Sequence, residues 1–318
     1  MNLKLINEFC ENEKIETPLL IKNVVKGVAN NGKPYLSVTF QDKTGTIDGK
    51  VWDASGDVPS HYGVGKIGIV HAEVLKYRDA LQLKILNFQE VDPTKINDMS
   101  RFIPVSMVEK EELVQTVTKY IDTIQDETLH TITKTIVEGC FEEFFSYPAA
   151  SKNHHEFMHG LATHVYGMLK LGDAMCDLYP LLNRDLLYAG IILHDVGKVY
   201  ELSGPVTTEY TMQGKLLGHI SIMQAIVYET ARKLGYENEQ VILLRHMILS
   251  HHGQYEFGSP VLPMIPEAEI LNYIDNIDAR MNMFTKIVEP LENGTFSGRN
   301  FSLENRQIYK ASFDKEDQ

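Results

Sequence analysis

The first third of the chain alternates apolar and polar side chains at the two-residue interval of β-strands. Five runs of this kind occupy residues 17–29, 34–40, 46–54, 66–77 and 80–91. Turn residues such as Asn30 and Gly32 separate the first two runs, and a polar stretch with Pro59, Gly63 and Gly65 lies between the third and the fourth. Five short strands with this interruption are typical of a small OB-type barrel.

From residue 108 onward, apolar positions recur at the intervals of three and four residues that indicate amphipathic helices. Strand signals are nearly absent there, and helical runs occupy residues 110–124, 129–147, 161–179, 184–197, 215–235, 238–253 and 268–284. The pattern therefore predicts two domains, a small all-β OB-type barrel followed by a larger all-α domain. We expect the barrel at residues 1–95, a linker and leading helices at 96–147, and the helical domain with a C-terminal tail at 148–318.

The composition indicates a soluble cytoplasmic protein with no membrane partner. Apolar residues make up 43% of the chain, which is enough for a buried core. No window approaches the roughly 20 consecutive apolar residues of a membrane span, and the first residues show no signal-peptide pattern. Cys10, Cys140 and Cys176 are far apart in the sequence, which indicates free thiols in a reducing compartment.

The net charge of −13 argues against a nucleic-acid ligand when it is taken alone, because such proteins usually carry a basic surface. The charge is unevenly distributed, however. Of the 30 basic and 43 acidic residues, 12 of each lie within residues 1–95, so the whole excess belongs to the rest of the chain. A neutral barrel is compatible with modest, salt-sensitive binding of a polyanion.

Histidines gather in the helical part of the sequence, where several lie at the ends of helical runs. With two acidic residues they form an ordered series: His164, the pair His194-Asp195, His219, the pair His251-His252, and Asp275. Imidazole and carboxylate groups together make a ligand set that divalent metals favour. A lone histidine, or one His-Asp pair, is more often an ordinary core or surface feature, but the whole series is hard to obtain by chance.

The order H…HD…H…HH…D resembles that of the HD superfamily of metal-dependent phosphohydrolases. Longer strings around it are similar to the YhaM family of bacterial 3′→5′ exoribonucleases, in which an OB domain precedes an HD domain. These strings are HGLATHVYGML, DLLYAGIILHDVGKVYELSGPV, GHISIM, SHHGQYEFGSP and AEILNYIDNIDARMNM. With the domain order, the similarity extends over nearly the whole chain. His159 departs from the family pattern, since a small residue is expected there.

The resemblance implies that the series holds two divalent metal ions. The ligands of the first ion would be His164, His194, Asp195 and Asp275. The ligands of the second would be His219, His251 and His252, with Asp195 bridging the two ions. Manganese is the first choice of metal and iron the alternative. Such a pair of ions would activate a water for in-line attack on phosphorus.

Two further residues follow the ligands at helical spacing. Lys198, three residues after Asp195, is assigned with Asp195 to catalysis through contact with a phosphate or the leaving group, although a solvated lysine would have the same spacing. Asp278, one turn after Asp275, is a candidate for orienting a ligand, and a solvent-facing side chain is the alternative.

The barrel extends the prediction to a polymeric substrate, because OB barrels bind single strands by stacking bases on aromatic side chains. Alternation of strand faces places about half of the barrel's aromatic residues in the core. We expect Trp52 and Phe88 in the core, and Tyr35 and Arg78 in contact with the nucleic acid.

The sequence therefore predicts a hydrolase, a metal-dependent 3′→5′ exoribonuclease that releases 5′-mononucleotides from single-stranded RNA. Its direction follows only from the resemblance, and single-stranded DNA stays open as a second partner. The alternatives are an HD hydrolase of small or cyclic nucleotides with a regulatory barrel, and a binding protein with an inactive HD domain. An exposed barrel edge allows a homo-oligomer, and the basic tail from Ser297 could hold either a strand or a neighbouring subunit.

Overall fold

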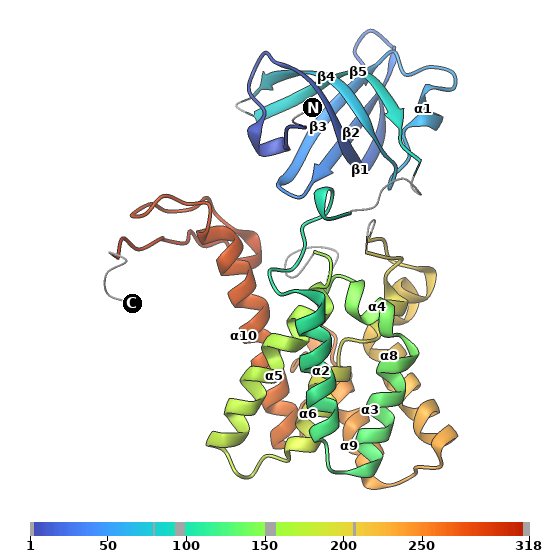
Figure 1. The fold of residues 1–318 in the computed structure, drawn as a ribbon, viewed down its shortest axis with the longest axis vertical. Coiled ribbons are helices and arrows are strands. Elements are labelled where there is room, and N and C mark those ends of the chain that lie inside the picture. Colours follow the sequence, from blue (N-terminus) through green and yellow to red (C-terminus); the bar gives the residue numbers. More distant parts are fainter. Residues whose placement is uncertain (1–2, 79, 93–98, 150–156, 206–207, 314–318) are drawn as a thin grey trace. The chain divides into compact units, whose positions relative to one another are not determined.

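The computed structural model describes residues 3–78, 80–92, 99–149, 157–205 and 208–313. These residues form two compact units, residues 1–105 and 106–318. The first consists of strands and the second of helices (Figure 1). The expected end of the barrel at residue 95 lies outside the described residues. No helix in the described part of the chain is long and apolar enough to cross a membrane.

The first unit is a closed five-stranded barrel with the strand order β1-β2-β3-β5-β4 (Figure 1). Its strands are β1 (Lys14–Val28), β2 (Pro34–Asp42), β3 (Gly45–Trp52), β4 (Ile67–Tyr77) and β5 (Ala80–Glu90). A short helix, α1 (Val58–His61), occupies the interruption between β3 and β4. The predicted OB-type barrel is confirmed.

Strand β1 is long because it takes part in two sides of the barrel. Its first half pairs with β4 and its second half with β2, and the register shifts between Ile21 and Asn23. Such a bulge bends a strand and increases its twist, which allows one strand to serve both sides. Parallel pairing of β3 with β5 closes the ring around Leu19, Phe40 and other buried apolar side chains.

The second unit contains every α-helix of the described residues except α1. These helices are α2 (Lys110–Thr123), α3 (Glu127–Gly139), α4 (Phe141–Ser146), α5 (Gly160–Leu178), α6 (Arg184–Leu193), α7 (Lys198–Glu201), α8 (Met212–Leu234), α9 (Glu239–Ser250) and α10 (Pro266–Val288). One predicted helix, 129–147, is divided into α3 and α4. The reason is local, since Cys140 leaves helical geometry with φ −135° and ψ 34° directly after Gly139.

Helix α6 lies at the centre of the helical unit and packs against α3, α5, α9 and α10. All of its residues from Leu186 to Leu193 are buried. A helix that is apolar all round can be stable in water only when neighbours cover every side. The side chain of Asn183 caps its start by accepting a hydrogen bond from the backbone N–H of Leu186 at 3.0 Å. Its other end therefore carries His194 and Asp195 into the interior.

Candidate metal centre

The predicted ligand series meets at one place in the helical unit. His164 comes from the first half of α5, His194 and Asp195 directly follow α6, and Asp275 lies within α10. His219 lies in α8, and His251 and His252 directly follow α9. Five segments that are distant in the sequence thus supply side chains to one site.

The first group of side chains comprises His164, His194, Asp195 and Asp275. His164 Nε2 lies 3.2 Å from Asp275 Oδ1, and His194 Nε2 lies 3.4 Å from Asp195 Oδ2. Potential ligand atoms of His164, His194 and Asp195 all lie within 4.8 Å of one another, and these three residues are buried. One cation could therefore contact all three.

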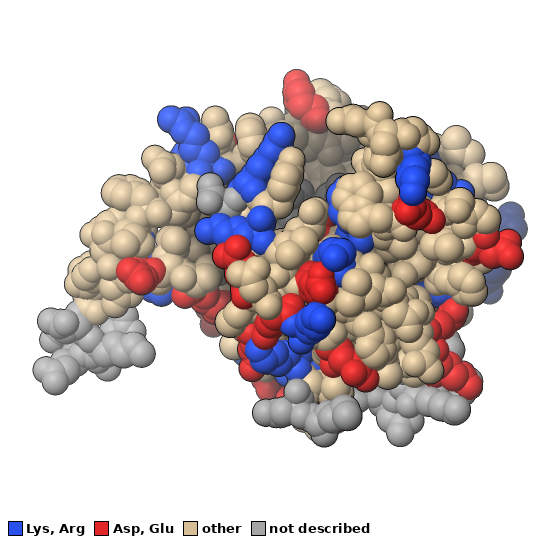
Figure 2. All heavy atoms as spheres, turned by 90° about the horizontal axis from the view of Figure 1, so that it is seen from above, with Lys and Arg blue, Asp and Glu red and all other residues tan. Residues whose placement is uncertain are grey.

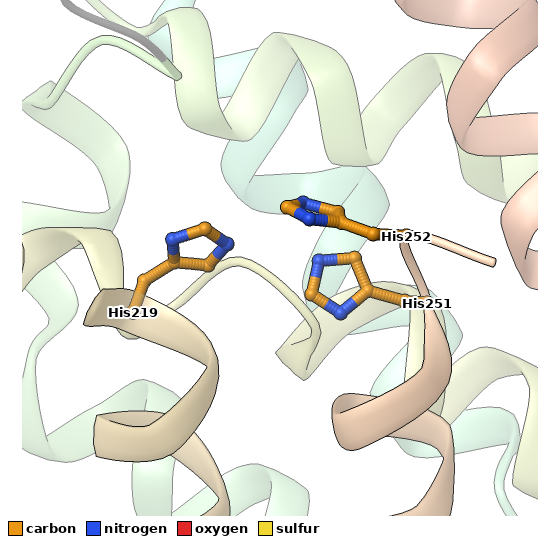
Figure 3. A group of neighbouring side chains, drawn as sticks. All are labelled: His219, His251 and His252. Carbon is orange, nitrogen blue, oxygen red and sulfur yellow. The ribbon is translucent and has the colours of Figure 1, made fainter. Parts of the chain in front are cut away.

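The second group comprises His219, His251 and His252, whose rings are turned toward a common space (Figure 3). Their ligand atoms also lie within 4.8 Å of one another. Asp195 Oδ1 lies 3.4 Å from His219 Nε2 and 3.8 Å from His251 Nε2. The carboxylate of Asp195 therefore faces one group with each of its oxygens.

Every histidine of the two groups places its Nδ1 next to an oxygen that accepts a hydrogen bond. The acceptors are the backbone oxygens of Ile191 for His194 (2.8 Å), Ile248 for His251 (2.7 Å) and Phe257 for His252 (2.7 Å), and the carboxylates of Glu201 for His219 (3.2 Å) and Asp278 for His164 (2.6 Å). Such oxygens require the hydrogen on Nδ1, so a neutral ring has its lone pair on Nε2. Metal-ligating histidines have this arrangement.

The Nε2 and carboxylate oxygen atoms that face the centre of the site are suited to binding a cation. Within the described residues, Nε2 of His194, His219 and His251 and Oδ1 of Asp195 are buried and have no hydrogen-bond partner. Buried polar atoms are rarely left in this state, since desolvation without a partner costs about 1–3 kcal/mol each. Lone pairs and a carboxylate oxygen around one space match the needs of divalent metal ions.

The protonation states of His251, His252 and Asp195 at the centre are suited to binding a metal ion. Burial lowers the pKa of His251 well below its ordinary value and also lowers that of His252, so both rings are neutral and can act as ligands. Burial alone would raise the pKa of Asp195, but Lys198 and His194 outweigh this effect and hold it well below its ordinary value. The carboxylate is therefore ionised at neutral pH.

Both nitrogens of His164 lie close to carboxylates, Nε2 3.2 Å from Asp275 and Nδ1 2.6 Å from Asp278. Burial lowers its pKa, but hydrogen bonds to Asp275 and Asp278 outweigh this effect and raise the pKa to about 10. The ring consequently carries two protons at neutral pH. A cation that binds at Nε2 has to displace one of them.

The sequence did not indicate the role of Glu201, which ends α7 and is only 7% exposed. Its carboxylate accepts hydrogen bonds from both Nδ1 and the backbone N–H of His219, the latter at 3.0 Å. Gly218 precedes His219 with a φ of +71°, which kinks α8 there. Gly197 also permits this contact, because a Cβ at Gly197 would lie 2.3 Å from the backbone oxygen of His219.

Comparisons with known proteins agree with this geometry. Residues 161–280 match the HD domain family. The 3'-5' exoribonuclease YhaM of Geobacillus sp. (strain WCH70) is 48% identical over 304 residues, which cover 95% of this chain and 93% of that protein. The same enzyme from Bacillus subtilis (strain 168) is 48% identical over 303 residues, 95% of this chain and 96% of that protein. The chain belongs to the YhaM family.

A solved structure also resembles part of this YhaM-family chain. It is the second OB-fold domain of replication protein A from Methanococcus maripaludis. The identity is 18%, the TM-score is 0.24, and the match covers 28% of this chain and 94% of that one.

A cavity of about 450 Å³ adjoins the two groups of side chains. Asp195, Lys198, His252 and Asp275 line it, together with residues of α10 and of the segment that follows. Lys198 Nζ lies 2.5 Å from Asp195 Oδ2, so the ammonium group is held at the cavity wall. The side chain of Asp278 lies behind His164, as its contact with Nδ1 shows. His159 directly precedes α5 and has a φ of +66°, a conformation that glycine adopts more easily.

The barrel has a groove of about 700 Å³ on its outer face. Tyr35 lines it, as do Trp52, Tyr77, Lys50 and Lys84. Arg78 lies outside this lining, with its guanidinium 5.3 Å from the ring centre of Tyr77.

The expectation for Trp52 was wrong, since its side chain is 54% exposed. Ile47 and Val51 of β3 are buried, so the next residue along the strand has to face outward. There the Trp52 ring lies 5.5 Å from that of Tyr35, its partner on β2. Phe88 instead packs against the barrel core, as expected.

Metal binding should release protons, and its affinity should fall as the pH falls below the raised pKa of His164. Isothermal titration calorimetry with Mn²⁺ at pH 7.5, repeated in buffers of different ionisation enthalpy, measures the number of protons released on binding. The His164→Asn variant should release about one proton fewer than the wild type. Equal proton release by the two proteins would contradict this assignment.

Replacement of Glu201 by alanine should weaken metal binding about 10- to 100-fold, because Nδ1 of His219 loses its acceptor. Glu201→Gln keeps an oxygen that can accept, and should retain much of the affinity. The measurement is metal content after dialysis against graded chelator. Glu209→Ala removes an exposed carboxylate from the neighbouring loop and serves as the control. Equal metal content in all four proteins would disprove the role.

Proposed function

We propose that this chain is a metal-dependent 3′→5′ exoribonuclease whose catalytic centre is the cluster around Asp195. The observation that carries the proposal is the shared orientation of the five histidines, each with Nδ1 beside an oxygen acceptor. The proposal is also supported by sequence similarity, because the chain is 48% identical, over 95% of its length, to a 3'-5' exoribonuclease. The reaction is hydrolysis of the phosphodiester at the 3′ end of single-stranded RNA.

We infer two divalent ions, with manganese as the first choice and iron as the alternative. Two groups of potential ligand atoms, with one oxygen of Asp195 facing each, support this number. His164, His194, Asp195 and Asp275 would hold one ion, and His219, His251, His252 and Asp195 the other. Such ions would supply an activated water and would offset the charge that develops on the phosphoryl oxygens.

The protein's own groups have separate tasks in this reaction. Asp195 is buried and ionised, so it keeps a negative charge at the point where both groups meet. Lys198 lines the cavity beside it and provides a cation for the phosphate or the departing oxygen. As the oxygen of water bonds to phosphorus, the bond to the 3′-oxygen of the penultimate nucleotide breaks and that oxygen takes up a proton. The products are a 5′-mononucleotide and a strand shortened by one residue.

The barrel would bind the strand by stacking, with Tyr35 and Trp52 as the platform. Lys50 Nζ lies 4.8 Å from the ring centre of Tyr35, so a cation accompanies the aromatic surface. Arg78 is proposed as a further contact at the edge of this groove. Basic and acidic side chains are interspersed on the face shown in Figure 2. This distribution supports modest, salt-sensitive affinity rather than strong electrostatic binding.

Digestion of a single-stranded RNA labelled at its 5′ end, with added Mn²⁺, should give a ladder of shortened labelled products. The Asp195→Ala variant should be slower by on the order of 100-fold or more, because both metal groups lose a shared carboxylate. Asp122→Ala, which removes an exposed carboxylate from α2, is the matched control and should keep wild-type activity.

Intact RNA with every divalent metal tested would overturn the proposal. Hydrolysis of free or cyclic nucleotides by the same preparation would then identify a small-nucleotide hydrolase. A single labelled mononucleotide released at the outset would instead indicate attack from the 5′ end. A parallel digestion of single-stranded DNA measures the preference between the two polymers.

Trp52→Ala should weaken binding of a short single-stranded RNA, because stacking on one aromatic ring contributes about 1–3 kcal/mol per base. The dissociation constant is measured in the Asp195→Ala background, in which the RNA survives. Leu86→Ala is the control, since Leu86 is also an exposed apolar side chain of the barrel (55%) but does not line the groove. Equal effects of the two substitutions would contradict a stacking role.

A further inference from the structure

The segment after α10 folds back on itself as a hairpin, residues 296–309, called here the C-terminal hairpin. Bridges pair Phe296 with Tyr309 and Asn300 with Arg306. Its tip is a tight turn in which Glu304 and Asn305 have φ values of +51° and +58°. Two consecutive left-handed residues that are not glycine are uncommon, and they persist where surrounding contacts hold them.

The contact that holds this turn is an ion pair with α10. Arg280 donates through two nitrogens to the two carboxylate oxygens of Glu304, at 2.8 and 3.1 Å. Arg306 adds a second cation 2.7 Å from the same carboxylate. A paired guanidinium and carboxylate of this kind fixes orientation as well as distance. The hairpin is therefore attached to the helix that carries Asp275.

This attachment places the hairpin at the catalytic cavity. Ser302 of the hairpin lines the cavity together with Asn276, Arg280 and Met283 of α10, and the cavity extends to Asp195 and Lys198. Phe257, which follows the metal-facing His252, contributes an aromatic ring. The volume of about 450 Å³ lies within the range of small-molecule sites. The lining thus combines apolar surface for a base with polar groups for a sugar.

We propose that the C-terminal hairpin forms one wall of the pocket for the 3′-terminal nucleoside of the strand, and that Glu304 is the positioning residue of this wall. The base packs against Met283 and Phe257, and the ribose hydroxyls face Asn276 and Ser302. The inference rests on the proposed exonuclease function, because that function places a terminal phosphodiester beside Asp195. The C-terminal hairpin accordingly belongs to the substrate site of its own chain.

Filling the cavity tests this assignment directly. Ser302→Trp should raise KM for a short oligoribonucleotide about tenfold or more, because a bulky side chain occupies the place of the nucleoside. Phe301→Trp is the matched control, since Phe301 is the neighbouring residue, is 88% exposed and does not line the cavity. Bound manganese should be unchanged in both variants. Hydrolysis of bis(p-nitrophenyl) phosphate, which has no nucleoside, should fall much less than that of RNA.

Removing the ion pair between Glu304 and Arg280 tests the role of Glu304. Glu304→Ala should raise KM severalfold and leave kcat and metal content near wild type, because the hairpin loses its link to α10. Glu292→Ala, an exposed carboxylate before the hairpin, is the control. The conservative variant Glu304→Gln keeps a side-chain oxygen that can accept a hydrogen bond from Arg280. It should recover part of the affinity that Glu304→Ala loses.

The outcomes separate this inference from the proposed function. Shortening of RNA by the wild type supports the function, whatever the variants do. If Ser302→Trp then has the KM of Phe301→Trp, the hairpin is no part of the pocket and the inference fails alone. Equal losses with RNA and with the small ester, or loss of manganese, would also overturn it, because the change would then act through the metal centre. A wild type that leaves RNA intact overturns both.

Discussion

Hydrogen bonds from the Nδ1 atoms of five histidines to protein oxygens are the contacts on which the geometry of the candidate metal centre depends. They place a hydrogen on Nδ1 of each ring, and Nε2 of His194, His219 and His251 is turned toward Asp195. Without them the rings could rotate, and a cation would find fewer aligned lone pairs. Because these acceptors lie on different helices and loops, the packing of the whole unit determines the geometry of the site.

The fold supplies these positions through a central helix that neighbours cover on every side. Helix α6 is buried from Leu186 onward, so its C-terminal end can only lead into the interior. That end carries a carboxylate into a nonpolar environment, which is costly unless opposite charges surround it. Lys198 provides such a charge, with its Nζ 2.5 Å from Asp195 Oδ2. The kink at Gly218 then directs α8 so that His219 reaches the same carboxylate.

Sequence patterns predicted the elements better than they predicted side-chain contacts. The alternation of residues 34–40 and 66–77 indicated barrel strands because period and burial are directly linked in a sheet. The metal-facing histidines were recognised because their order resembles that of a known family. Trp52 was misplaced because residue type alone does not give the register of a strand, and its neighbours Ile47 and Val51 face the core instead. Glu201 and the pairing of Arg280 with Glu304 depend on long-range packing, which no local spacing encodes.

The oxygens that accept hydrogen bonds from the histidine Nδ1 atoms differ in whether an amino-acid substitution can remove them. For His194, His251 and His252 the acceptor is a main-chain carbonyl, which every amino acid possesses, so a substitution at Ile191, Ile248 or Phe257 leaves the acceptor atom in place. Only His164 and His219 depend on side chains, those of Asp278 and Glu201. A single substitution at Asp278 or Glu201 can therefore remove the acceptor of one histidine in each group of side chains, whereas no side-chain substitution removes the acceptor atom of the other three.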